Sequence, residues 1–268
     1  MDVSHTTENQ SPRAAVVTGA TTGIGRATAL ELARRGWRVY AVGRRAERLD
    51  ALAAQAREEA VPGEVVPAPL DVTDEAAVAG LVARVDADGG IDTLVNIAGG
   101  ARGTDFVGAG SREDWEWMYR ANVLGTLAMC QAFLPGLRAH GEGTVLNLTS
   151  TAAVTAYEGG AGYNAAKMGQ HGLTAALRLE EAEHNVRVIE VLPGMVHTEE
   201  FSLMRLGGDA AAAEKVYAGV EKPLTAEDVA EVCVHALELP HHVNLDQIVM
   251  RPVAQAAQHK VIRKPVEA

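Results

Sequence analysis

Short runs of apolar, often β-branched residues alternate along the chain with longer, alanine-rich runs whose apolar positions recur at helical spacing. The strand-like runs cover residues 14–18, 38–42, 64–67, 93–97, 144–148, 186–192 and 246–250. The helix-like runs cover residues 25–35, 46–59, 74–85, 111–138, 163–183 and 226–239. Such alternation predicts an α/β fold, with a doubly wound parallel sheet and helices on both faces. The strands are apolar almost throughout, which fits a sheet that is buried on both sides.

This pattern is typical of a single domain of the Rossmann type. The chain has 268 residues, no proline- or serine-rich linker and no internal repeat, so we place the domain at residues 13–254. We expect residues 1–12 to form a flexible segment, and residues 255–268 to form a tail that is solvated or contacts another subunit. A glycine-rich loop at 99–110 and a small helical cap at 198–220 both follow predicted strands. Ligands of open α/β sheets bind at that edge.

Composition and charge exclude several classes of function. Hydrophobic residues make up 47% and charged residues 22% of the chain, which indicates a globular rather than a disordered protein. The net charge of −11 and the aromatic content of 4% argue against binding of nucleic acid. No apolar run approaches the ~18 residues of a membrane span, and residues 1–13 lack the apolar core of a signal peptide. We therefore expect no membrane association and a cytoplasmic location.

Neither the cysteines nor the histidines form a pattern typical of a disulfide or a metal site. Cys130 and Cys233 each lie in an apolar stretch, which predicts buried free thiols. His241 and His242 are adjacent, so their side chains point in different directions, and no further ligand stands at metal-binding spacing. The sequence therefore predicts no metal site.

The first predicted strand leads directly into a glycine-rich turn and then into a helix. Glycines allow the backbone to approach a pyrophosphate closely, and the helix that follows offers free N–H groups and the positive end of its dipole. Glycines also occur in ordinary turns, but the position in the first strand–helix unit favours a dinucleotide site. We assign the following residues to it: Gly19, Thr21, Thr22, Gly23, Ile24 and Gly25.

The end of the second strand decides between the two nicotinamide cofactors. An NAD enzyme usually carries an acidic residue there for the ribose 2′-hydroxyl, whereas this chain has Arg44 and Arg45. A guanidinium suits a 2′-phosphate, so we predict NADP(H), with Arg44 as the first candidate and Arg45 as the second. The alternative is that both are surface arginines at the start of a helix, where cations oppose the helix dipole.

Two further strand ends are expected to contact the cofactor. Asp71, followed by Val72, is placed to accept a hydrogen bond from an adenine amino group. The alternative is that Asp71 is the N-cap of the next helix. Asn96, Ala98 and Gly99 end the fourth strand, where small residues let the cofactor lie on the backbone.

Tyr163 and Lys167 are four residues apart on a predicted helix, which places the phenol and the ammonium on one face. A neighbouring positive charge lowers the pKa of a phenol, which then suits proton transfer to a carbonyl oxygen or from a hydroxyl. A tyrosine and a lysine at this spacing are common on helices, so the pair alone does not indicate a catalytic site. Ser150, however, follows the strand at 144–148 and meets the pair at the same sheet edge, where its hydroxyl suits an oxyanion-type role.

Two other segments belong to the expected site. Asn122 lies within a predicted helix, where asparagine is a modest helix former, so a buried structural or water-binding role is expected. The segment after the sixth strand contains Pro193, Gly194, Val196 and Thr198. Proline and glycine shape a turn there, and the Thr198 hydroxyl is a candidate partner for the nicotinamide carboxamide.

In order and spacing, the motifs TGATTGIG, NIAG, YNAAK and PGMVHT, with Asn122 and Ser150, resemble those of the short-chain dehydrogenase/reductase family over roughly residues 13–255. The resemblance implies a catalytic tetrad of Asn122, Ser150, Tyr163 and Lys167. It implies hydride transfer between the nicotinamide and a substrate carbon, with Tyr163 handling the proton. It also implies that Asn122 holds a water linked to Lys167. Ile97 stands where the family often has a second asparagine, and we expect this to alter only a local hydrogen bond.

A narrower resemblance covers the C-terminal third. Residues 198–244 resemble the branch that includes NADP-dependent 3-hydroxy acid and serine dehydrogenases and clavulanic acid dehydrogenase. It implies small polar 3-hydroxy or 3-oxo acids as substrates, or an aldehyde or ketone of secondary metabolism. Arg102 and Arg205 are candidates to bind a substrate carboxylate, and the alternative is that they are surface residues. We expect Trp115 and Trp117 to pack at a subunit interface rather than to contact substrate.

Two rival functions stay open on the sequence alone. The first is a 3-oxoacyl or polyketide ketoreductase that acts on a carrier-bound substrate, which a basic patch beside the pocket would favour. The second is a regulator that binds NADP without turnover, although the intact tetrad argues against it. The family resemblance implies a homotetramer, with a dimer as the alternative.

Overall fold

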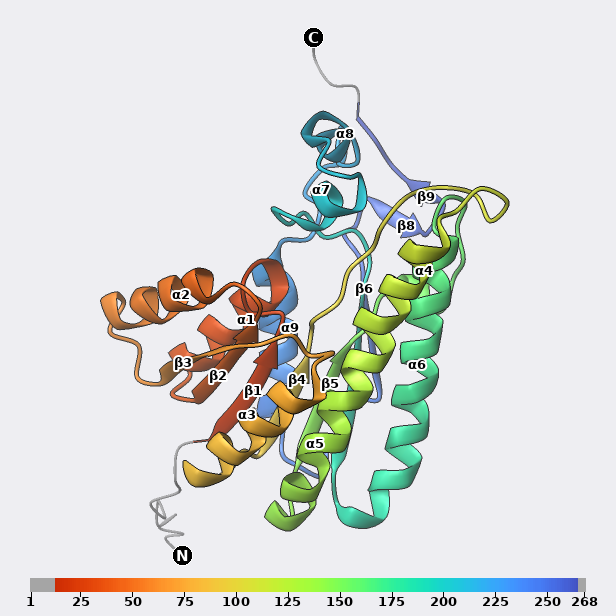
Figure 1. Ribbon diagram of the computed structural model, residues 1–268. Helices are drawn as coiled ribbons and strands as arrows, with labels where there is room; N and C mark the ends of the chain where they lie inside the picture. Colours follow the sequence, from red (N-terminus) through yellow and green to blue (C-terminus); the bar gives the residue numbers. More distant parts are fainter. Residues whose placement is uncertain (1–12, 265–268) are drawn as a thin grey trace, which may run out of the picture.

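The computed structural model describes residues 13–264, and within them seven parallel strands form one sheet (Figure 1). Their order across the sheet is β3-β2-β1-β4-β5-β6-β7, and every neighbouring pair is parallel. This confirms the predicted doubly wound sheet, with its switch point between β1 and β4. The strands are β1 (Ala14–Thr18), β2 (Arg38–Gly43), β3 (Glu64–Pro69), β4 (Thr93–Asn96), β5 (Thr144–Leu148), β6 (Arg187–Pro193) and β7 (Gln247–Met250).

Helices cover both faces of this sheet, as predicted. The helices α1 (Gly23–Arg34), α2 (Ala46–Glu58) and α9 (Ala226–Glu238) pack on one face. The helices α3 (Glu75–Ala87), α5 (Gly125–His140) and α6 (Ala161–Glu181) pack on the other, and α4 (Arg112–Tyr119) contacts α6 (Figure 1).

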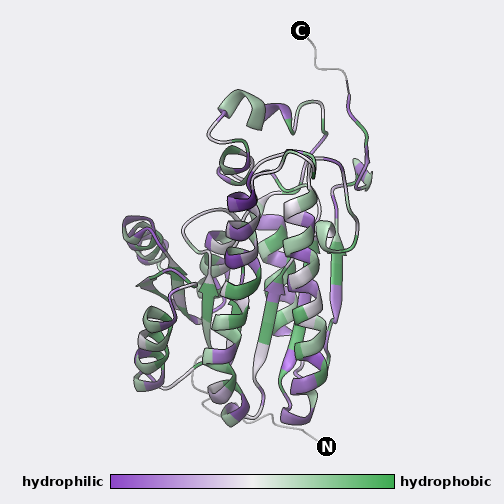
Figure 2. Ribbon diagram, turned by 45° about the vertical axis from the view of Figure 1, so that its right-hand side comes forward, coloured by the Kyte–Doolittle hydropathy of each residue, from purple (hydrophilic) through white to green (hydrophobic). Residues whose placement is uncertain are grey.

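Two hydrophobic cores result, one on each face of the sheet. Successive side chains of a strand point to opposite faces. Val17 of β1 therefore joins the core beneath α1, α2 and α9, whereas its neighbour Val16 joins the core beneath α3, α5 and α6. Both valines are 0% exposed. Figure 2 shows the corresponding pattern, with largely hydrophobic central strands and helices that mix hydrophobic and hydrophilic residues.

The run predicted as one helix over residues 111–138 contains a change of helical type. Between α4 and α5 the chain forms a π-helical turn at Arg120–Leu124. Such turns are rare and occur frequently at functional sites. Asn122 lies in the middle of this turn and is 0% exposed. Apolar spacing predicted the helix but could not indicate this local widening.

Further short elements lie beyond the carboxyl ends of the strands. The helices α7 (Phe201–Arg205) and α8 (Ala210–Lys215) occur within the segment predicted as a helical cap. A turn of 3₁₀ helix at Thr151–Ala153 follows β5, whereas a second one at Ala182–His184 follows α6, at the opposite edge of the sheet. The strands β8 (Gln255–Ala257) and β9 (Lys260–Val261) form an antiparallel hairpin at the same end of the molecule as α7 and α8 (Figure 1).

The segment after residue 254, expected to be a separate tail, packs against the domain as far as residue 264. Gln255 is buried, and its side-chain oxygen accepts a hydrogen bond of 2.8 Å from the backbone N–H of Met195. Arg263 donates hydrogen bonds to the carbonyl oxygens of Val216 and Ala218 in the cap, at 3.0 and 2.6 Å. The expected flexible segment 1–12 and the last residues, 265–268, lie outside the described part of the chain.

Residues 13–264 contain neither a helix that could cross a membrane nor a cluster of metal-binding side chains. None of the helices in this part of the chain has the length and apolar character that a membrane crossing requires. The same residues bring together no group of three or more side chains that could hold a metal ion.

Candidate functional site

A cavity of about 990 Å³ lies at the carboxyl ends of the central strands, beneath the cap. Most of the residues expected at the site line it, although they come from distant parts of the chain. Asn96 and Asn122 do not line it. The expected residues that do are Gly19, Thr21, Thr22, Gly23, Ile24, Gly25, Arg44, Arg45, Asp71, Val72, Ala98, Gly99, Ser150, Tyr163, Lys167, Pro193, Gly194, Val196 and Thr198.

The glycine turn between β1 and α1 packs too closely against neighbouring backbone to accept side chains at Gly19 and Gly25. Gly19 has a φ of +71°, and a Cβ atom there would lie 3.0 Å from the backbone nitrogen of Ala98. A Cβ atom on Gly25 would collide with the carbonyl oxygen of Gly19. The N-cap residue of α1, Thr22, makes no side-chain capping hydrogen bond. The first N–H groups of α1 thus face the cavity without a side-chain cap, which is the donor set that phosphate requires.

The two arginines after β2 have different surroundings. Arg44 is exposed at the cavity, whereas the guanidinium of Arg45 makes two hydrogen bonds of 2.8 Å to the carboxylate of Glu200 in the cap. Arg45 also donates to Thr21 Oγ1 at 3.0 Å. The pairing raises the pKa of Arg45 and lowers that of Glu200. Within residues 13–264, Arg44 makes no side-chain hydrogen bond or ion pair, so of the two it is the better placed to bind a phosphate.

Asp71 lies at the cavity, in a turn before α3. Its Oδ1 accepts hydrogen bonds from the backbone N–H and the hydroxyl of Thr73, at 2.9 and 2.8 Å. The N-cap of α3 is Asp74, whose side chain accepts from Ala76 and Ala77. The alternative in which Asp71 caps this helix is therefore wrong.

Tyr163 lies in the first turn of α6 and is 8% exposed. Its ring meets that of Phe201 in the cap edge-on, with 5.7 Å between centroids. Burial raises the pKa of the phenol above its ordinary value and Tyr157 adds to the rise, whereas the Ser150 hydroxyl and the Arg205 guanidinium lower it. A phenol in this setting is protonated at neutral pH and needs further positive charge to ionise.

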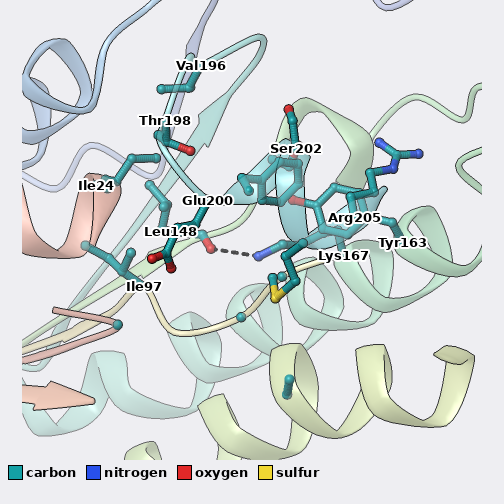
Figure 3. A pocket seen from close by; sticks show the side chains of 18 of the residues that line it. Ile24, Ile97, Leu148, Tyr163, Lys167, Val196, Thr198, Glu200, Ser202 and Arg205 are labelled. Atoms are coloured by element: carbon teal, nitrogen blue, oxygen red, sulfur yellow. Dashed lines mark hydrogen bonds between the residues drawn. The ribbon is translucent and has the colours of Figure 1, made fainter. Parts of the chain in front are cut away.

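Lys167 lies one helical turn after Tyr163 and is 4% exposed. Its Nζ atom donates a hydrogen bond of 3.2 Å to the carbonyl oxygen of Leu148, at the end of β5 (Figure 3). Burial lowers the pKa of Lys167 to about 7, and the negative charge of Glu190 acts in the opposite direction. Burial thus favours the neutral amine, and the charge of Glu190 favours the ammonium.

Ser150 is held in place by the backbone on both sides. Its Oγ accepts from the N–H of Ala152 at 3.1 Å and lies 3.4 Å from the carbonyl oxygen of Pro193, to which it donates. The first contact caps the 3₁₀ turn that follows β5. The serine hydroxyl is thus positioned at the cavity beside Tyr163.

Asn122 and Asn96 lie behind the cavity. The side-chain amide of Asn122 donates to the carbonyl oxygens of Gly100 and Met118 at 2.9 and 2.7 Å, and its oxygen accepts from the N–H of Gly100 at 3.2 Å. It therefore fixes the loop after β4. Asn96 donates to Asn147 Oδ1 at 2.9 Å within the sheet.

Several cavity residues were not expected from the sequence. Gln255 and Gln258 line the cavity, and Gln258 accepts a hydrogen bond of 2.8 Å from Thr151. No local motif surrounds either glutamine, so only the packing of the hairpin brings them here. Trp117 also lines the cavity, where it can contact a ligand, and its packing at a subunit interface stays a prediction. Helical spacing alone did not indicate which face of α4 turns inward.

The two candidate arginines for a substrate carboxylate are separated by the structure. Arg102 does not line the cavity; it lies 3.4 Å from Asp114 and stacks over the Trp117 ring at 4.1 Å. Arg205 does line it, on the side of Tyr163 (Figure 3). Its two Nη atoms donate to the Tyr157 hydroxyl and to the carbonyl oxygen of Gly159, each at 2.8 Å.

Comparisons with known proteins agree with this arrangement. Residues 13–205 match the family model described as short chain dehydrogenase. An uncharacterized oxidoreductase of Mycobacterium tuberculosis is 48% identical over 97% of this chain and 99% of its own length. An NADP-dependent 3-hydroxy acid dehydrogenase of Salmonella typhi is 38% identical over 90% of this chain and 95% of its own.

A solved structure shows the same fold. The closed form of a serine dehydrogenase complexed with NADP⁺ superimposes with a TM-score of 0.86 and 36% sequence identity, over 94% of this chain and 100% of that one. The family resemblance read from the motifs, including its narrower branch, is thereby confirmed.

Proposed function

Because this chain belongs to the short chain dehydrogenase family, we propose that it is an NADP(H)-dependent oxidoreductase that interconverts a carbonyl group and an alcohol. One observation carries the proposal: the glycine turn of residues 19–25, Ser150, Tyr163 and Lys167 all line one cavity. The turn and the N-terminus of α1 bind the cofactor phosphates. Arg44 binds the 2′-phosphate. The named relatives that depend on NADP support this assignment.

The chain's own residues handle the proton and the charge of the reaction. When bound, NADPH supplies the hydride that reduces the carbonyl carbon. Tyr163 donates its phenolic proton to the carbonyl oxygen, and in oxidation its phenolate accepts the hydroxyl proton. Ser150 gives up its long contact of 3.4 Å with the carbonyl oxygen of Pro193 and donates its one hydroxyl proton to the same oxygen. Lys167 supplies the positive charge that stabilises the phenolate.

We propose small polar 3-oxo and 3-hydroxy acids as the substrate class. Arg205 supports this substrate class, because it lines the cavity and its positive charge lowers the pKa of Tyr163. A guanidinium has five N–H groups. One on each Nη binds Tyr157 or Gly159, so one on each remains for a carboxylate.

A substrate panel monitored by NADPH absorbance tests the proposal. It contains 3-oxo acids, neutral ketones and aldehydes of similar size, and 3-oxoacyl thioesters on a carrier protein. We expect the free acids to give the highest kcat/KM. Exclusive turnover of carrier-bound thioesters would identify a ketoreductase instead. NADPH binding without any turnover would identify a regulator.

Replacing Arg205 with leucine is expected to raise KM for a 3-oxo acid at least tenfold, because a charge-assisted pair with the carboxylate is lost. KM for a neutral ketone should change much less. Steady-state kinetics with the two substrates measures the difference. Arg102→Leu is the matched control, and an equal effect of both variants would contradict the assignment of Arg205.

We also propose that the protein is a cytoplasmic homotetramer, with a dimer as the alternative. Tyr119 of α4, Leu124 of the π-turn and Met168 of α6 are 48%, 44% and 40% exposed on three elements that contact one another, and neighbouring exposed apolar side chains favour contact with a second copy. Light scattering on the purified protein measures the assembly.

A further inference from the structure

Gln170 lies beneath Lys167, outside the cavity, and is 0% exposed. Its side-chain oxygen accepts a hydrogen bond of 2.8 Å from Lys167 Nζ. Its amide nitrogen donates to Thr126 Oγ1 of α5 at 3.0 Å. Within residues 13–264, the other acceptor of Nζ is the backbone carbonyl of Leu148. Gln170 therefore provides the side-chain hydrogen bond that this ammonium makes in the described part of the chain.

The donor and acceptor roles in this network follow from its chemistry. An ammonium only donates, so the amide oxygen of Gln170 must face Lys167 and the amide nitrogen must face Thr126. The Thr126 oxygen therefore accepts, and its own proton is donated to the carbonyl oxygen of Asn122 at 2.8 Å. The hydrogen bonds thus run in one direction, from the ammonium to the π-turn.

A second series of hydrogen bonds reaches Gln170 from the sheet. Asn96 donates to Asn147 at 2.9 Å, and Asn147 donates to Thr174 at 2.9 Å. Thr174 donates to the backbone carbonyl oxygen of Gln170 at 2.8 Å. Asn96 and Asn122 were both expected at the site, and neither lines the cavity. The backbone carbonyl of Asn122 connects to the ammonium through Thr126 and the Gln170 side chain, whereas the series from Asn96 ends at the backbone of Gln170.

The charged and titratable groups around Nζ are few. Glu190 of β6 is 0% exposed, and its charge raises the pKa of Lys167. It contacts His171 of α6 at 2.9 Å. The Tyr163 ring lies 5.8 Å from Nζ, whereas α5 and β5 present neutral groups, the Thr126 hydroxyl and the carbonyl of Leu148. Burial lowers the pKa of Lys167 to about 7, and a hydrogen bond that favours the charged form acts against that lowering.

We propose that Gln170 is a positioning residue that holds the Lys167 ammonium beneath Tyr163 and keeps it charged. The inference rests on the proposed function, in which Lys167 supplies positive charge to Tyr163. The amide oxygen accepts a stronger hydrogen bond from the charged ammonium than from the neutral amine, whose N–H groups are weaker donors. Without it, the buried amine loses its proton at lower pH.

The first test measures Lys167 directly in the cofactor-free protein, by NMR titration of lysines labelled at Cε. The lysines of the chain are Lys167, Lys215, Lys222, Lys260 and Lys264, and the Lys167 signal is assigned by its loss in Lys167→Met. We expect Gln170→Leu to lower the titration midpoint by about one pH unit, and Gln170→Glu to raise it by about one pH unit. Gln131→Leu, on the exposed side of α5, is the matched control and should leave it unchanged.

The second test is the pH dependence of kcat for carbonyl reduction. Its alkaline limb, where Lys167 loses its proton, should move to lower pH in Gln170→Leu and to higher pH in Gln170→Glu. Thr126→Val should move it less, in the direction of the leucine variant. If Gln170→Leu does not fold, Gln170→Met makes the same measurement with a side chain of similar length.

Opposite shifts of the midpoint in the two Gln170 variants support the proposal, because loss of packing would move the midpoint in the same direction in both variants. Unmoved midpoints in both variants would overturn it, even if activity falls. Absence of turnover in the native protein would overturn the proposed function, while the NMR midpoints would still decide the role of Gln170.

Discussion

Replacing Tyr163 with phenylalanine is expected to reduce carbonyl reduction about a thousandfold, within the range of about 10²–10⁴ for loss of a general acid. The substitution removes the proton donor but keeps the ring that packs edge-on against Phe201. NADPH binding should therefore persist. The measurements are steady-state NADPH oxidation and titration of NADPH fluorescence.

The matched control for this experiment is Tyr119→Phe. Tyr119 is 48% exposed and lies outside the cavity, so loss of its hydroxyl should leave turnover unchanged. Unchanged turnover in Tyr163→Phe itself would contradict the assignment of Tyr163 as acid and base. Loss of NADPH binding together with activity would indicate a damaged site instead of a missing proton donor.

Replacing Arg44 with aspartate is expected to reverse the cofactor preference. The variant loses charge-assisted hydrogen bonds to the 2′-phosphate and gains a carboxylate that accepts from the 2′-hydroxyl of NADH. Loss of one such bond costs about 1.5–3 kcal/mol, so the ratio of kcat/KM for NADPH to that for NADH should fall about a hundredfold. Kinetics with each cofactor at fixed substrate measures this ratio.

Arg48→Asp is the control for the charge change itself. Arg48 lies in the first turn of α2, one turn beyond Arg44, outside the cavity and with its side chain 47% exposed. We expect the ratio of specificity constants to change little in this variant. A native protein that prefers NADH would contradict the role of Arg44, whatever the variants do.

The strands and helices were predictable because their signals are local. The central strands β1 and β5 match the predicted ranges, since runs of apolar residues at these positions fit only a sheet covered on both faces. The edge strand β3 continues through Pro67 to Pro69, two residues beyond its predicted end. An edge strand tolerates proline because an N–H that faces away from its neighbour makes no ladder hydrogen bond.

The cofactor turn and the pair Tyr163–Lys167 were predictable for a similar reason. Each depends on residues close in sequence, the turn on glycines that permit a tight backbone and the pair on one helical turn. The pairing of Arg45 with Glu200 joins residues far apart in the chain, so no local pattern carried it. The same is true of the hydrogen bond between Gln170 and Thr126.

The sequence by itself therefore determined the fold class, the family and the chemical groups available at the reacting end. Periodicity, turn chemistry and motif spacing are properties of neighbouring residues, and they are readable without the fold. The tertiary structure alone decided which side chains are buried together. It left Arg44 open to a phosphate, turned Arg205 rather than Arg102 toward the cavity, and placed Gln170 beneath Lys167. Burial and hydrogen-bond partners set the charge of an ionisable group, and both depend on residues that only folding brings together.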